Sequence, residues 1–82
     1  MGKVSEKQII IKPSKVEVVG DTLKITLKAK TYVFQLTDIS RRLAVASKAS
    51  RQNFKISPSG YGIHWPDADE DLSVPALINR VK

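Results

Sequence analysis

Apolar and polar residues alternate between Val16 and Leu36, and this alternation constrains the fold more than any other feature of the 82-residue chain. A period of two predicts strands with one buried face and one polar face. The pair Gly20-Asp21 suits a turn, and a second tight turn is expected at Ala29-Lys30-Thr31. The segment is therefore predicted to form a three-stranded antiparallel meander. Its expected inward side chains are Val16, Val18, Leu23, Ile25, Leu27, Ala29, Tyr32, Phe34 and Leu36.

Beyond Leu36 the apolar residues recur at helical spacing. Either Thr37 or Asp38 can cap the start of a helix, and Ser47 can cap a second, shorter helical turn. The chain is therefore expected to leave the meander through a middle helical segment. The side chains expected on the buried face of this segment are Ile39, Leu43 and Ala46.

A second β-hairpin is predicted in the C-terminal third. Phe54 and Ile56 alternate with polar neighbours and precede the turn-forming run Ser57-Pro58-Ser59-Gly60. Another alternating stretch follows from Tyr61 to Trp65. Two short alternating stretches on either side of a turn are typical of paired strands.

An acidic loop and a capped helix are expected at the end of the chain. The loop follows Pro66 and holds four acids in the five residues from Asp67 to Asp71. Ser73 can cap the last helix, and Pro75 is tolerated in its first turn. The side chains that this helix is expected to bury are Val74, Leu77, Ile78 and Val81.

These elements predict a single α+β domain in residues 14–82. One small antiparallel sheet of four to six strands is expected, made of the meander and the second hairpin, with the middle helical segment and the C-terminal helix packed on one face. Residues 1–13 are expected to form an N-terminal arm, in which Ile9-Ile10-Ile11 could make a short edge strand before Pro13. A chain of this length has room for one core.

Composition excludes several classes of protein. The chain has no cysteine, which excludes disulfides, thiolate metal sites and cysteine nucleophiles. Its longest apolar runs, of three or four residues, are far below the ~20 residues needed to cross a bilayer, and no signal-peptide core follows Met1. We therefore expect a cytoplasmic protein that makes no membrane contact.

Basic residues dominate the first two-thirds of the chain. The formal net charge of +6 divides into +8 for residues 1–55, with twelve Lys or Arg against four acids, and −2 for residues 56–82. Basic side chains along one side of the sheet and helix would bind phosphates without sequence preference. A solvated polar face is the simpler explanation, because no aromatic ring accompanies them for stacking on bases. The candidate nucleic-acid-binding residues are Lys24, Lys28, Lys30, Arg41, Arg42, Lys48, Arg51 and Lys55.

His64 and the acids that follow it have the residue types of a catalytic or metal site. The spacing of the aspartates in residues 67–71 resembles the start of a calcium-binding loop. However, Leu72 stands where such a loop needs glycine, and Ile78 stands where it needs a bidentate glutamate. A lone histidine without cysteine also argues against zinc. We therefore predict no catalytic residue, no metal and no cofactor, and expect that the protein is not an enzyme.

Two runs near the C-terminus read Gly60-Tyr61-Gly62-Ile63-His64-Trp65-Pro66 and Asp69-Glu70-Asp71-Leu72-Ser73-Val74. Together they resemble the signature of a bacterial family catalogued as domain of unknown function 2442, and the likeness extends from about Val16 to Ile78. It departs at Lys28-Ala29-Lys30, where the family tends to have Asp-Gly, and in residues 47–51, where the family tends to have a capping acid. The resemblance implies a β-meander, a helical segment and a short closing helix.

The family has no established activity, but some members are encoded beside another small, uncharacterised domain in a toxin–antitoxin-like arrangement. That pairing implies a non-enzymatic binding protein, which we expect to dock a small toxin-like protein as its antitoxin-like partner. The second hairpin combines aromatic rings, an imidazole and negative charge, and this combination suits a basic partner. Nucleic-acid binding is the alternative, and exposed sheet edges are compatible with a homodimer. The predicted partner-binding residues are Tyr61, His64, Trp65, Asp67, Asp69, Glu70 and Asp71, of which both rings also fit a place in the core.

Overall fold

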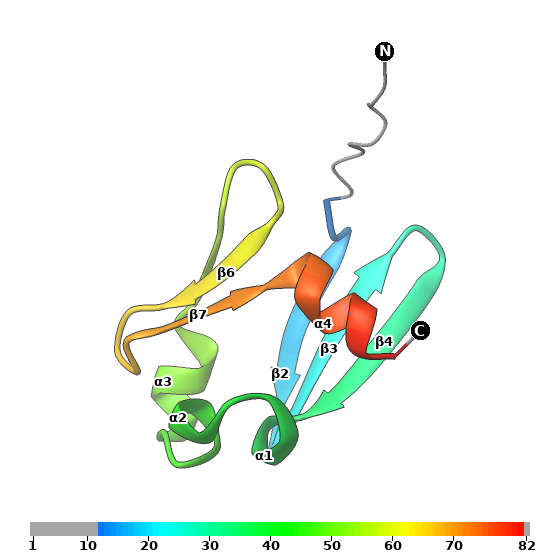
Figure 1. Ribbon diagram of the computed structural model, residues 1–82. Coiled ribbons are helices and arrows are strands. Elements are labelled where there is room, and N and C mark those ends of the chain that lie inside the picture. Colours follow the sequence, from blue (N-terminus) through cyan, green and yellow to red (C-terminus); the bar gives the residue numbers. More distant parts are fainter. Residues whose placement is uncertain (1–11, 82) are drawn as a thin grey trace.

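The computed structural model of the chain, drawn in Figure 1, describes residues 12–81. It confirms the predicted α+β class, and none of the helices in this part of the chain is long and apolar enough to cross a bilayer. The edge strand expected at Ile9-Ile10-Ile11 lies outside the described residues. In chain order the elements are β2 (Lys15–Val19), β3 (Thr22–Leu27), β4 (Lys30–Gln35), α1 (Leu36–Ile39), α2 (Arg41–Ala44), α3 (Lys48–Gln52), β5 (Lys55–Ile56), β6 (Gly62–Trp65), β7 (Glu70–Ser73) and α4 (Val74–Arg80).

The first sheet has the strand order β2-β3-β4 and is the predicted antiparallel meander. Successive residues of a strand point to opposite faces, so the alternating apolar residues of the central strand, such as Leu23, are buried in the core. Gly20 adopts a positive φ of 58° in the first turn, which confirms the turn at Gly20-Asp21. The face turned away from the core carries a cross-strand row of Glu17, Lys24 and Val33.

The second turn of the meander lies earlier than predicted. Leu27 pairs with Lys30, so Lys28 and Ala29 make a two-residue turn. Ala29 is therefore exposed in the turn and does not belong to the inward set. Lys28 adopts a φ of 56°, in the left-handed region that costs most L-residues energy. The prediction was wrong because the Lys28-Ala29 pair contains no glycine that would mark the turn.

The second sheet has the order β5-β6-β7, so six strands are divided between two sheets where one was predicted. The hairpin of β5 and β6 is confirmed. The expected acidic loop is wrong in its second half, because Glu70–Ser73 forms β7 and pairs with β6, and only residues 66–69 make the turn. Leu72 is the single apolar residue of β7. Such a segment has no alternating pattern, and its pairing with β6 keeps it extended.

The middle helical segment is broken at Ser40, between α1 and α2. Ser40 has an extended backbone, with φ −159° and ψ 107°, and its side-chain oxygen accepts a hydrogen bond from the Leu43 amide at 3.2 Å. It therefore caps the start of α2. The first helix begins at Leu36 without a side-chain cap, so the predicted caps at Thr37 and Asp38 were wrong.

Serine residues cap the two later helices, as predicted. Ser47 accepts a hydrogen bond from the Ser50 amide at 3.1 Å, and Ser73 accepts one from the Ala76 amide at 3.2 Å. Val81 lies beyond the last turn of α4 and is exposed, so its predicted place on the buried face was wrong. The helix buries Val74 and Leu77, as predicted.

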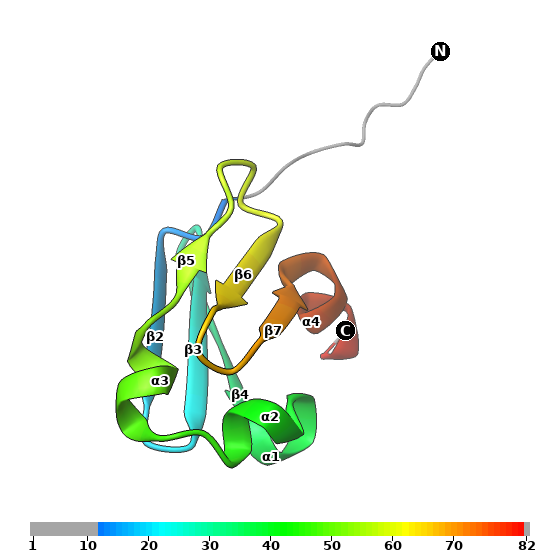
Figure 2. The same ribbon diagram turned by 90° about the vertical axis from the view of Figure 1, so that its left-hand side faces the viewer.

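The core lies between the two sheets and is closed by the helices. Figure 2 shows the second sheet standing in front of the first, with α4 at one side and α1 to α3 at one end. Burial of one large apolar side chain stabilises a fold by about 1.5–3 kcal/mol, so this shared core fixes the second sheet against the first. The side chains that are fully buried come from both sheets and the helical segment: Leu23, Ile25, Leu36, Leu43, Ile63 and Trp65.

Candidate partner-binding surface

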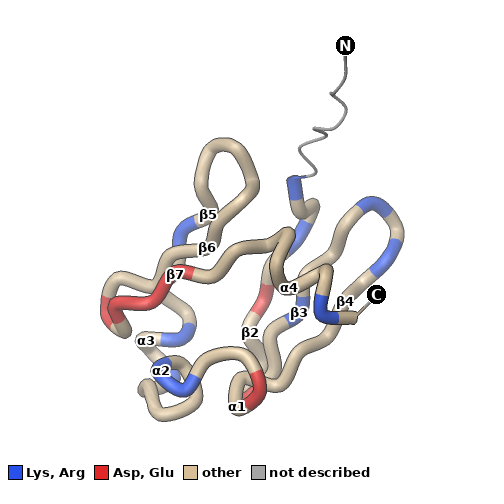
Figure 3. Tube along the Cα trace, viewed as in Figure 1, with Lys and Arg blue, Asp and Glu red and all other residues tan. Residues whose placement is uncertain are grey.

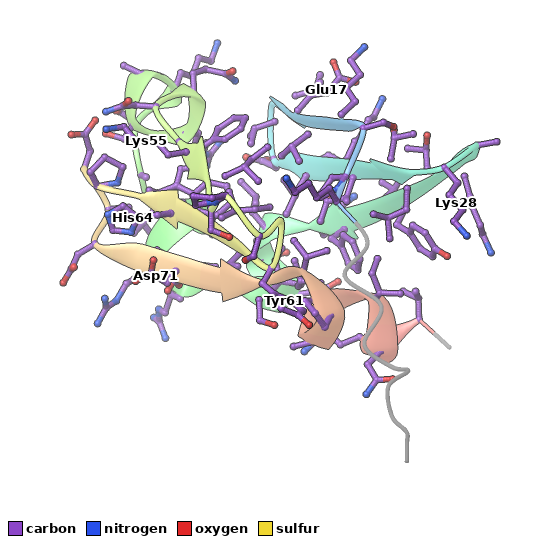
Figure 4. The ribbon with its side chains drawn as sticks, turned by 90° about the horizontal axis from the view of Figure 1, so that it is seen from above. Glu17, Lys28, Lys55, Tyr61, His64 and Asp71 are labelled. Atoms are coloured by element: carbon purple, nitrogen blue, oxygen red, sulfur yellow. The ribbon has the colours of Figure 1, made fainter. Side chains whose placement is uncertain are left out.

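His64, one of the predicted partner-binding residues, lies on the face of the second sheet that points away from the core. Ile63 and Trp65 of β6 point into the core, so His64 between them points outward. The strand register places His64 between Lys55 of β5 and Asp71 of β7. Figure 4 shows His64 and Asp71 side by side on the side of the sheet that is remote from the first sheet. We call Lys55, His64 and Asp71 the outer row.

His64 and Asp71 form a cross-strand pair, with 2.7 Å between the imidazole Nδ1 and the carboxylate Oδ1. The two side chains remain 46% and 79% exposed. Water screens such a pair, so it adds only about 0.2–1 kcal/mol to stability. The hydrogen bond fixes the orientation of the imidazole at the surface, where ring and carboxylate together can contact an incoming group.

Tyr61 lies at the end of the same sheet, next to the start of α4. Its carbonyl accepts a hydrogen bond from the Val74 amide at 2.7 Å, so the backbone at Tyr61 is tied to the helix start. The ring is exposed, and Figure 4 places it near α4. Tyr61 precedes β6 whereas the acidic turn follows it, so the two lie at opposite ends of this strand.

Trp65 does not belong to the surface, which corrects its predicted role in partner binding. Its side chain is fully buried, and its ring lies 5.7 Å from that of Phe54, centroid to centroid. The indole N–H donates a hydrogen bond to the carbonyl of Arg51 at 3.0 Å. A buried indole whose polar group is satisfied in this way is a core residue.

The four acids of the β6–β7 hairpin differ in the contacts that they make. Three of them contact the helical segment and the residues that follow it, and Arg42 also donates a hydrogen bond to the carbonyl of Asp69. Asp71 is left as the acid of the outer row. In residues 12–81 no three His, Asp or Glu side chains are grouped to hold a metal ion. The three contacts are Asp67 with Asn53 at 3.1 Å, Asp69 with Arg42 at 3.7 Å, and Glu70 with Ser40 at 2.5 Å.

Arg51 belongs to the predicted basic surface but is an internal hydrogen-bond donor. Its guanidinium donates to the carbonyls of Leu43 and Ala44 at 2.9 and 2.7 Å. It also donates to the carbonyl of Gly20 at 3.0 Å and to the carboxylate of Asp21 at 2.8 Å. Only 11% of the side chain is exposed. Arg51 therefore holds the end of α2 against the β2–β3 turn and is withdrawn from any nucleic-acid surface.

The other basic residues of the alternative prediction are spread over several elements. Figure 3 shows Lys and Arg on the β3–β4 hairpin, on α2, near α3 and on β5. Lys28 and Lys55 lie at opposite ends of the molecule in Figure 4, and Arg42 is paired with Asp69. The structure does not bring the eight residues Lys24, Lys28, Lys30, Arg41, Arg42, Lys48, Arg51 and Lys55 onto one face.

A groove that the sequence did not indicate lies beside β4. It has a volume of about 250 Å³ and is lined by residues 33–35 of β4, by Asp38 and Ile39 of α1, and by Arg80 and Val81 at the end of α4. The Arg80 side chain donates a hydrogen bond to the carbonyl of Asp38, 42 positions away in sequence, at 3.2 Å. No local pattern can indicate a groove whose walls are so far apart in sequence.

Comparisons with known proteins agree with this fold. Among solved structures, the crystal structure of a protein of unknown function from Rhodospirillum rubrum is similar at 26% identity and a TM-score of 0.68, over 85% of this chain and 87% of that one. No curated protein matches the chain. The family described as "Protein of unknown function (DUF2442)" matches residues 13–82. Because that match covers most of the sequence, the chain belongs to the DUF2442 family.

Proposed function

We propose that this protein is a non-enzymatic binding domain that docks another small protein, as the antitoxin-like partner of a toxin-like protein. The observation that carries the proposal is the His64–Asp71 pair, which presents an imidazole and a carboxylate on the exposed face of a sheet whose other face is core. Tyr61 adds an exposed ring. We call Lys55, Tyr61, His64 and Asp71 the docking surface.

The docking surface rests on a well-anchored strand. β6 is the central strand of its sheet, and the side chains of Ile63 and Trp65 on either side of His64 are fully buried. Residues held in this way lose little conformational entropy when a partner binds. The second sheet therefore supports recognition of a folded protein surface.

Charge near the docking surface favours a basic partner. The chain as a whole carries +6, but Figure 3 shows the acids of the β6–β7 turn and β7 gathered at one end of the molecule. Asp69 and Asp71 keep most of their side chains exposed despite their contacts with Arg42 and His64. Complementary charge raises association rates and disfavours wrong partners. A small protein with a basic patch, encoded beside this chain as in some members of the family, suits this end.

The test is calorimetric binding of the purified full chain to the purified product of the neighbouring gene. We expect Tyr61→Ala and His64→Ala each to weaken the affinity by about tenfold or more, because an interface contact of this kind contributes at least ~1.4 kcal/mol. Lys28→Ala, at the opposite end of the molecule, is the matched control and should leave the affinity unchanged. No binding by the wild-type chain, or unchanged binding by both variants, would contradict the proposed function.

A further inference from the structure

The first sheet ends at β4, whose far edge is unpaired within residues 12–81. Along an antiparallel strand, residues that bond to the neighbour alternate with residues that face away. Leu27 and Lys30 close a two-residue turn and so exchange hydrogen bonds. At the other end the Leu36 amide donates to the Asp21 carbonyl at 2.8 Å, which continues the same alternation. The residues whose peptide groups point away from β3 are therefore Thr31, Val33 and Gln35.

The β4 edge lacks the features that keep edge strands from pairing. Natural edges are commonly protected by charged residues, proline or bulges. Residues 31–35 read Thr-Tyr-Val-Phe-Gln, without charge, proline or glycine, and are rich in strand-favouring types. The edge strand β2 instead carries Lys15 and Glu17, and the Gln52 side chain donates to its Val18 carbonyl at 2.6 Å. Of the two edge strands of the first sheet, β4 is the one suited to accept a further strand.

We infer that β4 pairs with β4 of a second copy of this chain, antiparallel and centred on Val33. In this register the two Val33 peptide groups exchange hydrogen bonds, and Thr31 of each copy faces Gln35 of the other. The arrangement is self-complementary, as a two-fold interface requires. It joins two three-stranded sheets into one of six strands.

Charges at the ends of β4 favour a second copy as the occupant. Lys30 begins β4, and α1, which contains Asp38, follows β4 directly. Antiparallel pairing places the start of one β4 beside the start of α1 in the other copy. Each Lys30 ammonium then lies near an Asp38 carboxylate, while the two lysines stay at opposite ends of the paired strands. Opposite charges across paired strands stabilise them, and like charges directly opposite would not.

The groove beside β4 adds apolar surface to the same edge. Val33 and Val81 line it, and both are about half exposed. Covering apolar surface removes it from water and contributes ~25 cal/mol per Å². The contact is small, with three outward residues of β4 in each copy, so we expect weak, reversible association.

The test is sedimentation equilibrium of the full chain over about a hundredfold range of concentration, where we expect a monomer–dimer equilibrium. Val33→Lys should abolish the dimer, because two lysines would then face each other at the symmetry axis. Val19→Lys is the matched control: it has the same 53% exposure, lies on the same face of the sheet and adds the same charge, but on β2. A monomeric wild-type chain, loss of the dimer in both variants, or a dimer undiminished in Val33→Lys would overturn the inference.

Amide hydrogen exchange identifies what occupies the edge. As concentration rises, the Thr31, Val33 and Gln35 amides should become protected, whereas those of Tyr32 and Phe34 face β3 and should be protected throughout. Edge amides already protected in a monomer would assign the edge to another segment of the same chain. Protection that needs the neighbouring gene product would assign it to a different protein. Either result overturns the dimer, and neither touches the docking surface on the second sheet.

Discussion

The Cα atom of Lys12 lies 2.8 Å from the point that a Cβ atom on Gly60 would occupy. Gly60 also adopts a φ of 80°, which L side chains rarely tolerate. The start of the described chain therefore crosses directly over the β5–β6 turn, and glycine is required there for two separate reasons. The crossing fixes the turn from which Tyr61 and β6 emerge.

We expect Gly60→Ala to lower the free energy of unfolding by about 2–4 kcal/mol, since left-handed strain and a backbone clash add together. Gly20→Ala is the control, because Gly20 also has a positive φ, of 58°, but no atom lies within 4 Å of the point that its Cβ atom would occupy. That variant should lose only about 1–2 kcal/mol. Urea denaturation measures both, and equal losses would mean that Lys12 does not press on the turn.

Lys28→Asn should stabilise the protein. Lys28 has a φ of 56°, and asparagine enters the left-handed region more readily than lysine. We expect a gain of about 0.5–1 kcal/mol, which for a domain of this size raises Tm by several degrees. Ala29→Asn in the same turn is the control and should bring no gain, because Ala29 has no positive φ. A lower Tm for Lys28→Asn would show that the turn is not left-handed at this residue.

Arg51→Ala should cost about 2–4 kcal/mol of stability, because it removes the side-chain donor from the part-buried carbonyls of Leu43 and Ala44, of which Leu43 keeps only the Ala46 amide at 3.2 Å. Arg41→Ala removes the same charge from an exposed position and should change stability by no more than about 0.5 kcal/mol. Thermal unfolding compares the two variants. Full stability in Arg51→Lys would show that the charge, and not the hydrogen-bond geometry, is what matters.

Much of the fold could be predicted because its signals are local. The alternation from Val16 to Leu36 depends on residues two positions apart, and the caps at Ser47 and Ser73 bond to amides three residues further along the chain. The strand Glu70–Ser73 could not be predicted, because its extended conformation depends on pairing with β6 and not on its own composition. The division into two sheets could not be predicted either, because it depends on how the strands pack around a shared core and not on any local sequence pattern.

The candidate site could be predicted in part. The alternation along β6 that exposes His64 also buries Trp65, so only His64 of these two neighbours can contact a partner. The contact between His64 and Asp71 depends on the register that the β6–β7 turn imposes. The role of Arg51 could not be inferred, because two of its acceptors lie 30 and 31 residues away in sequence, in the β2–β3 turn.

The His64–Asp71 pair should matter little for folding. A double-mutant cycle with His64→Ala and Asp71→Ala, measured by urea denaturation, should give a coupling of about 0.2–1 kcal/mol. Both single variants should remain folded, so a loss of binding in them reports on the surface and not on unfolding. A coupling above about 2 kcal/mol would place the pair in a structural role instead.

The docking surface is tested most directly by amide chemical-shift mapping of the full chain during titration with the purified product of the neighbouring gene. We expect the largest shifts at Tyr61, His64 and Asp71, with the β3–β4 turn undisturbed. Largest shifts at Lys28 and Lys30, with an unchanged second sheet, would contradict the assignment of this face.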